Sequence, residues 1–306
     1  MKRVVLLGAG AIGAYIVWGF HKAKDIDFCV LAEGERKERL KKEGLKINGE
    51  RYDFPIKSSE EIKEVDLLLC AVKTTSLKDV LPLIQKVVGK DTVIMSLLNG
   101  VESEALIGEV VGEEHLITSL IRITAQRQLN EITFPLPKGR MGIIYGEVDG
   151  KESERMQEIE QIFSKTEILS HKSHNIQKEL WSKFALNISC NLPQAILNCG
   201  IGANLDSAHV YSLGKKLWEE VACLARAQDI FLSEDGFEKL IAPMEAIRSA
   251  RYSTLQDLDA KRKTEIDAFS GAVMRIGKKY DIETPYNEFV YHVILAMEEK
   301  IEGKIQ

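Results

Sequence analysis

Three glycines near the start of the chain constrain its fold more than any other feature. The six residues from Gly8 to Gly13 form the pattern G-x-G-x-x-G, directly after an apolar run (4–7) and at the start of a helical pattern (11–24). In this context the first glycine permits a tight turn, the second lets the backbone approach a pyrophosphate, and the third lets helix and strand pack closely. The helix N-terminus adds free N–H groups and a positive dipole end. The motif therefore predicts a dinucleotide-binding turn formed by Gly8, Ala9, Gly10, Ala11, Ile12 and Gly13.

Short apolar runs alternate with helical patterns through the first half of the chain. This alternation is typical of βαβ units, which form a parallel sheet with right-handed crossovers. The Asn48-Gly49 pair predicts a hairpin turn, because both residues tolerate the positive φ that such a turn needs. The expected strands are 4–7, 28–32, 45–47, 51–54, 66–72, 92–97, 116–124, 131–134 and 141–145, and the expected helices between them are 11–24, 35–43 and 76–88.

Helical patterns dominate the second half, and no convincing strand follows Ile168. The chain is therefore predicted to hold an α/β N-terminal domain with a doubly wound parallel sheet (1–170) and an all-helical C-terminal domain (171–306). A cleft between two such domains is a common place for a ligand. The expected helices are 152–164, 174–192, 207–228, 234–250, 258–279 and 285–302.

Composition excludes several classes of protein. The chain has 306 residues, 45% of them hydrophobic, and a net charge of −5, so no large basic field exists to hold nucleic acid or an anionic membrane. Its five cysteines form no C-x-x-C pair, which favours a reducing compartment and a cytoplasmic protein. We expect no membrane span and no signal peptide, because glycines break the apolar N-terminal stretch. We also expect no metal site, since His171 and His174 have no acid or cysteine ligand nearby.

Three polar residues are spaced four apart in the predicted helix 174–192. Lys183, Asn187 and Asn191 would lie on one face of that helix. Asparagine is unfavourable inside a helix, because its amide competes for backbone hydrogen bonds. The spacing alone leaves two interpretations open, a ligand-binding face or a polar stripe satisfied by solvent or by the core. Pro193 is expected to bend or end the helix.

With these motifs in view, the chain resembles the ketopantoate reductase (2-dehydropantoate 2-reductase) family over essentially its whole length. The resemblance is carried by the glycine motif, by Val72-Lys73, by Leu98-Asn99-Gly100, and by the segments 181–191 and 253–267. It implies a Rossmann domain followed by a helical domain, NADPH as hydride donor, and reduction of 2-dehydropantoate to pantoate for coenzyme A synthesis. It also implies a small 2-oxo acid as substrate, and a homodimer formed through the helical domain.

For the helical half, the resemblance implies a role for each of five residues. Lys183 is the general acid beside the substrate carbonyl, and a protonated lysine suits a reaction that develops negative charge on that oxygen. Asn187 and Asn191 orient the carbonyl and hydroxyl groups, and Ser253 binds the substrate carboxylate. Glu265 lines the site, positions cofactor or substrate, and as a nearby carboxylate keeps the lysine protonated.

For the nucleotide half, the resemblance places Lys73 and Asn99 near the nicotinamide and the reacting carbonyl, and has Ala125 contact the cofactor through its backbone. Glu33 follows the second strand, where an acid usually accepts hydrogen bonds from the adenosine ribose and favours NAD. Family members often have an arginine near this position, which suits the 2′-phosphate of NADP. The choice between NADP and NAD stays open, because three basic residues that could bind that phosphate follow Glu33 at once: Arg36, Lys37 and Arg39.

Two departures from the family pattern keep other activities open. The family often has Asn-Pro in the active helix, whereas here Leu192 separates Asn191 from Pro193, and Asn204 is the nearest match to a further substrate-binding asparagine. The alternatives are a dehydrogenase of another 2-oxo or 3-hydroxy acid, and a protein that senses NAD(P)H without turnover.

Overall fold

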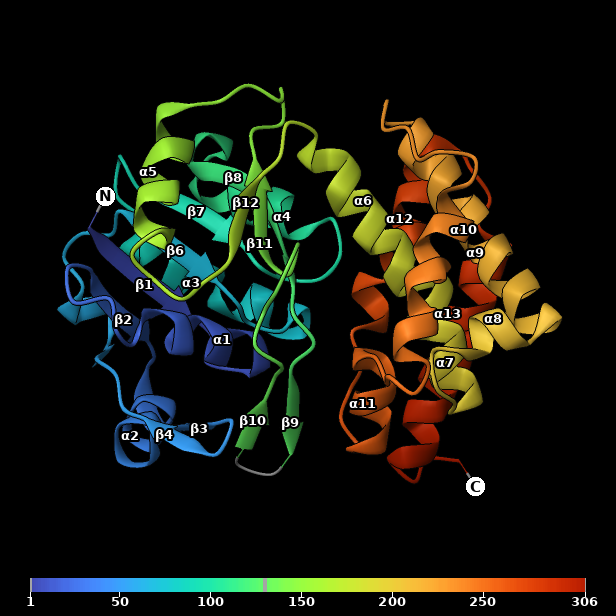
Figure 1. Cartoon of the computed structure of the whole chain (residues 1–306), viewed down its shortest axis with the longest axis horizontal. Helices are drawn as coiled ribbons and strands as arrows, with labels where there is room; N and C mark the ends of the chain where they lie inside the picture. Colours follow the sequence, from blue (N-terminus) through green and yellow to red (C-terminus); the bar gives the residue numbers. More distant parts are fainter. Residues whose placement is uncertain (1, 129–130, 306) are drawn as a thin grey trace. The chain divides into compact units, whose positions relative to one another are not determined.

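The computed structural model describes residues 2–128 and 131–305. The chain divides into two units, Met1–Ile176 and Gln177–Gln306, which Figure 1 colours from blue to yellow-green and from yellow to red. The sequence predicted a division at 170. Strand β12 (Ser170–Lys172) belongs to the sheet of the first unit, so the expectation of no strand after Ile168 is wrong. At three residues, β12 is too short for a periodic pattern to reveal it.

The main sheet of the first unit has the strand order β12-β11-β8-β7-β6-β1-β2-β5. In this spatial order, neighbouring strands from β8 to β5 are parallel, and β11 runs antiparallel to β8. The chain builds outward from β1 to one edge and then returns to the other side of β1, so the strand order reverses there, at the point where doubly wound sheets bind ligands. The bounds are β1 (Arg3–Leu7), β2 (Asp27–Leu31), β5 (Ile56–Lys57), β6 (Leu67–Cys70), β7 (Val93–Ser96), β8 (Leu116–Arg122) and β11 (Gly142–Gly146).

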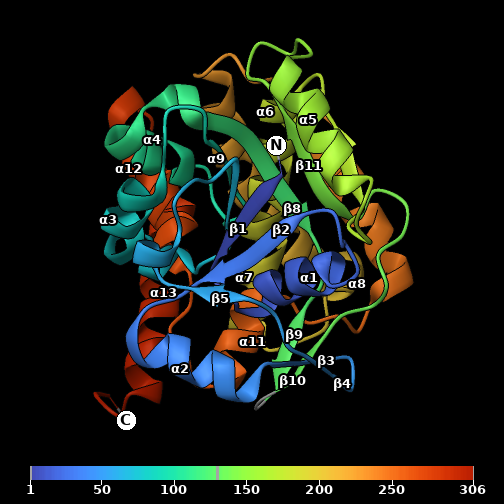
Figure 2. The same ribbon diagram turned by 90° about the vertical axis from the view of Figure 1, so that its left-hand side faces the viewer.

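Helices cover both faces of this sheet, which confirms the doubly wound prediction. Helices α1 (Ala11–Phe20) and α5 (Glu154–Phe163) lie on one face, and α3 (Leu77–Val87) and α4 (Ser103–Val111) lie on the other (Figure 2). Successive strand residues alternate between the two apolar clusters, with Leu6 on the α1 side and Val5 on the α3 side. Each strand is apolar on both faces because each face is buried.

A second, small sheet has the order β4-β3-β10-β9. Its strands are β3 (Leu45–Ile47), β4 (Glu50–Tyr52), β9 (Gln126–Gln128) and β10 (Glu131–Thr133), and helix α2 (Gly34–Glu43) precedes β3. The predicted hairpin is confirmed: β3 and β4 are antiparallel, and the turn residues Asn48 and Gly49 have φ of 49° and 89°. Parallel pairing of β10 with β3 brings segments more than 80 residues apart into contact.

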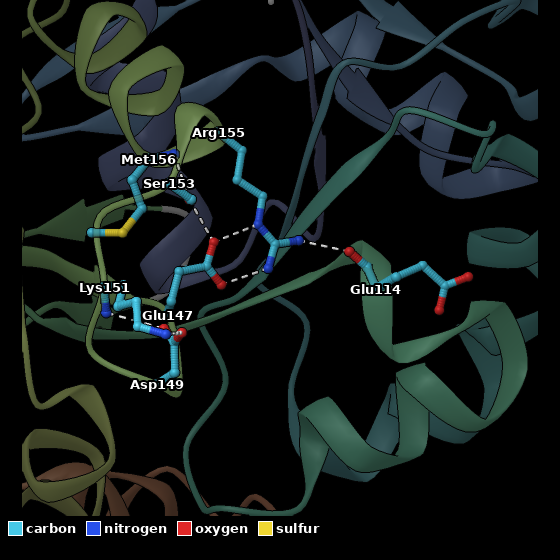
Figure 3. Close-up of polar contacts among 7 residues, drawn as sticks. All are labelled: Glu114, Glu147, Asp149, Lys151, Ser153, Arg155 and Met156. Carbon is cyan, nitrogen blue, oxygen red and sulfur yellow. Dashed lines mark hydrogen bonds and ion pairs between the residues drawn. The ribbon is translucent and has the colours of Figure 1, made fainter.

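An arginine in α5 ties three parts of the first unit together (Figure 3). Arg155 donates two hydrogen bonds to the Glu147 carboxylate, from Nε at 2.7 Å and from Nη2 at 2.6 Å, and a third from Nη1 to the Glu114 carbonyl oxygen at 2.6 Å. Ser153 caps α5 and also donates to Glu147 at 2.6 Å. The hydrogen bonds from Arg155, above all, lower the pKa of Glu147. This cluster anchors α5 to the end of β11.

In the second unit, every regular element of the described residues is helical, as predicted (Figure 1). No helix in the described ranges is long and apolar enough to cross a membrane. The elements are α6 (Ile176–Leu186), which begins at the last residue of the first unit, η4 (Asn187–Asn191), α7 (Leu192–Leu197), α8 (Ala203–Asp206), α9 (Ala208–Arg226), α10 (Gly236–Ile241), η5 (Ala242–Ile247), α11 (Ser253–Asp259), η6 (Ile266–Ala268), α12 (Ser270–Tyr280) and α13 (Pro285–Ile301).

Three predicted helices differ from the structure. The expected helix 174–192 is interrupted by a π-turn, η4, and Pro193 lies in the first turn of a further helix, α7, instead of ending one. A proline fits in a first turn, where its missing N–H is least needed. The expected helix 258–279 is broken between α11 and α12, where Lys261 has a φ of 52°. The expected helix 234–250 becomes α10 followed by the 3₁₀ segment η5.

Candidate functional site

The glycine turn joins β1 to α1 at the switch point of the sheet. Gly8 has a φ of 105°, and a Cβ there would lie 2.6 Å from the Ala71 carbonyl at the end of β6. A Cβ on Gly13 would lie 1.9 Å from the Gly8 carbonyl oxygen, whereas a Cβ on Gly10 would meet nothing within 4 Å. Two glycines are therefore required by the protein's own packing. The remaining glycine, Gly10, borders open space beside the N-terminus of α1, so this turn fits a pyrophosphate.

Two other predicted residues lie at the same edge of the sheet. Lys73 is exposed just after β6, and Asn99 is half-buried just after β7. Since β1, β6 and β7 are adjacent and parallel, their carboxyl ends bring Lys73, Asn99 and the glycine turn to one edge. Ala125 lies between β8 and β9 and packs against the apolar cluster on the α1 side.

Glu33 lies just beyond β2, but its carboxylate already has a partner. Its Oε1 accepts a hydrogen bond from the Ser59 backbone N–H at 2.8 Å, and this bond is the main reason that the pKa of Glu33 is lowered. Lys37, one of the three basic residues considered for a 2′-phosphate, forms an ion pair with Glu61. Glu33 thus holds the segment after β5 in addition to any contact with a ribose, and Lys37 is already neutralised.

Two further arginines of the first unit lie near enough to Arg36 for their charges to act on it. Desolvation, followed by the positive charges of Arg39 and Arg127, lowers the pKa of Arg36. Arg36 and Arg39 belong to α2, whereas Arg127 belongs to β9 of the small sheet. Within the described residues, none of the three pairs with a carboxylate. Like charges held together without a counterion favour binding of an anion.

In the second unit, the predicted polar residues follow the helix from α6 into η4. Lys183 is half-buried near the end of α6, and Asn187 is the first residue of the π-turn. The Asn187 side-chain nitrogen, Nδ2, is buried and has no hydrogen-bond partner among the described residues. A buried donor without a partner costs about 1–3 kcal/mol, so this amide is a candidate to bind an oxygen of a ligand.

The structure brings Asn191 and Ser253 together across 62 residues of sequence. The fully buried Asn191 donates from Nδ2 to Ser253 Oγ at 3.2 Å, and its Oδ1 accepts from the Thr254 backbone N–H at 3.3 Å. Ser253 is the first residue of α11, and the buried Thr254 hydroxyl has no hydrogen-bond partner in the part of the chain that the structure describes. Two unpartnered polar atoms and a serine hydroxyl therefore lie on η4 and the start of α11, two elements joined by Asn191.

Glu265 is buried in the broken region between α11 and α12. Its neighbour Thr264 donates from its N–H (2.7 Å) and its hydroxyl (2.6 Å) to Glu298 Oε1 on α13. The chain is not helical at Glu265, although this residue falls within the expected helix 258–279. Contact of Glu265 with Lys183 or with a cofactor stays a prediction.

Sequence reasoning missed residues whose partners are distant in the chain. Gln194 donates to the Ala250 carbonyl oxygen at 2.6 Å and accepts from the Tyr252 N–H at 2.8 Å, which fixes the segment before Ser253. No local pattern could reveal this role, nor that of Glu298 or Arg127. Asn204 is buried in α8, and its amide donates to the Ile201 carbonyl oxygen at 2.9 Å.

No group of three or more histidine, cysteine, aspartate or glutamate residues in the described ranges could hold a metal ion.

Comparison with known proteins gives consistent matches. The family model "Ketopantoate reductase PanE/ApbA" matches residues 4–141, and "Ketopantoate reductase PanE/ApbA C terminal" matches residues 175–298. The 2-dehydropantoate 2-reductase of Aquifex aeolicus (strain VF5) is 26% identical in an alignment 316 residues long. The alignment covers 97% of this chain and 97% of that protein.

Solved structures agree with these matches in fold. The 2-dehydropantoate 2-reductase from Geobacter metallireducens GS-15 has a TM-score of 0.84 and 24% identity, covering 96% of this chain and 99% of that one. A D-mandelate dehydrogenase solved with NADH and anilino(oxo)acetate has a TM-score of 0.86 and 24% identity, covering 98% of this chain and 99% of that one. These likenesses confirm the two-part fold, a Rossmann-like α/β unit and a helical unit.

Proposed function

Because this chain belongs to the ketopantoate reductase family and is an NAD(P)-dependent oxidoreductase, we propose that it reduces ketopantoate (2-dehydropantoate) to pantoate. The reaction converts the C2 carbonyl of a 2-oxo acid into a hydroxyl group. The substrate must therefore bind through an oxygen at C2 and a carboxylate, and a proton must reach the C2 oxygen.

The observation that carries this proposal is the unpartnered amide nitrogen of Asn187. A ligand oxygen at that nitrogen would supply the missing hydrogen-bond acceptor. Asn191 holds the Ser253 hydroxyl at 3.2 Å, and that hydroxyl still has a proton to donate. We assign the C2 oxygen to Asn187 and the carboxylate to Ser253. One donor for the carbonyl oxygen and one for the carboxylate suit a 2-oxo acid, whose carbonyl and carboxylate are adjacent.

Lys183 supplies the proton in this scheme. A nicotinamide dinucleotide at the glycine turn, when bound, supplies the hydride that forms the new C–H bond at C2. The carbonyl electron pair moves to the C2 oxygen, and Lys183 Nζ gives that oxygen a proton, which the lysine regains from solvent. As an ammonium group, Lys183 also stabilises the negative charge that develops on the oxygen. Glu265 favours the protonated lysine.

Arg36, Arg39 and Arg127 support NADPH as the preferred donor. The 2′-phosphate is the group that distinguishes NADPH from NADH, and arginine binds phosphate with strong, charge-assisted hydrogen bonds. We assign the phosphate to Arg36 and Arg127, which carry no counterion among the described residues. Glu33 already accepts a hydrogen bond from the Ser59 N–H, so part of its charge is compensated within the protein.

The direct test is a substrate screen that follows absorbance at 340 nm. Ketopantoate, phenylglyoxylate and a 3-oxoacyl-CoA are each offered with NADPH and with NADH. We expect turnover of ketopantoate, fastest with NADPH. Faster turnover of phenylglyoxylate would indicate a mandelate-type dehydrogenase, and binding of NADPH without turnover of any substrate would indicate a sensor. A homodimer and a cytoplasmic location stay predictions.

A further inference from the structure

The two asparagines of the proposed site lie in the π-turn η4, in which hydrogen bonds join residues five apart. An α-helix rotates by about 100° per residue, so the four residues from Lys183 to Asn187 pass a full turn by roughly 40°. A second α-helical step of four residues would move Asn191 further in the same direction. Because a π-turn has more residues per turn, the step from Asn187 to Asn191 rotates less and returns Asn191 toward the line of the other two side chains.

One residue within this stretch interrupts the regular α-helical hydrogen bonds. Pro193 has no N–H, so it cannot donate to the Ser189 carbonyl oxygen, which is the acceptor four residues before it. In addition, the Ser189 hydroxyl donates to the Ala185 carbonyl oxygen at 2.7 Å. The backbone oxygen of Ser189, which therefore has no donor at position 193, lies close to a neighbouring helix.

That neighbour is Gly214, which is buried in the middle of α9. A Cβ at Gly214 would lie 2.7 Å from the Ser189 carbonyl oxygen and 2.9 Å from the Phe237 ring carbon Cζ. The first contact is with backbone, which cannot rotate away as a side-chain end can. Any larger residue at 214 must therefore move η4 or move α9 away from it. Glycine is unfavourable inside a helix, so its presence here points to close packing.

We propose that Gly214 is a positioning residue for the substrate: by admitting the Ser189 carbonyl against α9, it holds the π-turn in the register that aligns Asn187 and Asn191 with Lys183. Gly214 itself touches no substrate in this scheme. The proposal rests on the proposed function, because it takes Asn187 as a substrate ligand and Asn191 as the residue that holds the substrate ligand Ser253.

Two variants test whether the register of the π-turn depends on this packing, one by adding bulk and the other by adding a backbone donor. Gly214→Ala adds a methyl group against the Ser189 carbonyl. Pro193→Ala adds no bulk there and restores the N–H that a regular α-helix would use. The matched control is Gly108→Ala in α4, a buried helical glycine of the first unit whose added Cβ would meet side-chain carbons at 3.1 Å and a backbone atom, Glu113 Cα, only at an ordinary contact distance of 3.6 Å.

We expect both test variants to raise KM for ketopantoate roughly ten- to hundredfold, as expected for loss of a hydrogen bond to a charged substrate. The dissociation constant for NADPH should stay within twofold of the wild-type value, because the glycine turn belongs to the first unit. The control should leave both quantities unchanged. A lower melting temperature with an unchanged KM would overturn the proposal, because it would mean that Gly214 serves packing alone.

Hydrogen exchange gives a readout that does not need turnover. Mass spectrometry of peptides that cover residues 184–193 should show faster amide exchange in Gly214→Ala than in the wild type, and no change in the control. If the wild type fails to reduce ketopantoate while this exchange difference is present, the proposed function fails and the role of Gly214 in holding the π-turn stands. Equal exchange in Gly214→Ala and the wild type would reject that role.

Discussion

The variant Gly10→Ala should weaken nucleotide binding without lowering the stability of the fold. Gly10 has φ −89° and ψ −155°, an extended conformation that alanine adopts, and the new Cβ would meet no atom within 4 Å. The free energy of unfolding should therefore be unchanged or higher by about 0.4–1 kcal/mol. Gly13→Ala should behave differently, because its Cβ would lie 1.9 Å from the Gly8 carbonyl oxygen.

The cost of Gly10→Ala should fall on NADPH binding. A methyl group displaces the pyrophosphate by about 1.5 Å, one C–C bond, which is enough to break hydrogen bonds at the start of α1. Loss of two charge-assisted bonds at about 1.5–3 kcal/mol each predicts roughly 10²- to 10⁴-fold weaker binding.

Two titrations of the apo protein measure these effects: NADPH binding by fluorescence, and unfolding by urea. We expect Gly10→Ala to lose affinity and keep its stability, and Gly13→Ala to lose stability. Wild-type NADPH affinity in Gly10→Ala, or a clear loss of its stability, would refute the assignment of the turn.

Three further predictions concern the first unit. Arg155→Met should lower the free energy of unfolding by about 2 kcal/mol and the melting temperature by roughly 5 °C, because it leaves the half-buried Glu147 carboxylate without its main partner; a calorimetric shift under 1 °C would contradict this. Since the pKa of Glu147 is lowered in the folded state, its contribution to the free energy of unfolding should be complete above the unfolded pKa of about 4.3 and lost as the pH falls through the folded pKa. The stabilities of the wild type and Arg155→Met should therefore converge as the pH falls, as measured by acid unfolding. A stability difference that stays constant with pH would be inconsistent with this reasoning. Replacing Arg36 and Arg127 by glutamine should raise KM for NADPH at least tenfold and leave KM for NADH within twofold. Glu33→Gln, which can still accept a hydrogen bond from the Ser59 N–H, should shift the preference further toward NADPH. Equal effects of the arginine replacements on both nucleotides would rule out a phosphate site.

Much of the first unit could be predicted because its signals are local. The strand–turn–helix around Gly8 and the hairpin at Asn48-Gly49 each depend on a few consecutive residues, and both are present. The cluster of arginines could not be predicted, because Arg127 joins it only through the pairing of β10 with β3. A single sequence carries no local signal for such a pairing.

The second unit was harder to predict in detail. Spacing correctly placed Lys183, Asn187 and Asn191 on one helical path, but the prediction assumed a constant α-helical period. The π-turn changes that period, and its causes include a glycine on another helix, Gly214. The apolar pattern after Leu258 resembled a continuous helix, although the chain turns out of helical geometry at Lys261.

The most direct measurement is the single-turnover rate of ketopantoate reduction by enzyme saturated with NADPH, compared between the wild type and Lys183→Ala. The matched control is Lys178→Ala, which removes an exposed lysine from the same helix. Loss of the proton donor should slow Lys183→Ala by roughly 10²- to 10⁴-fold, with NADPH affinity unchanged and the control at the wild-type rate. A Lys183→Ala variant as fast as the wild type would contradict the role of this lysine as the acid.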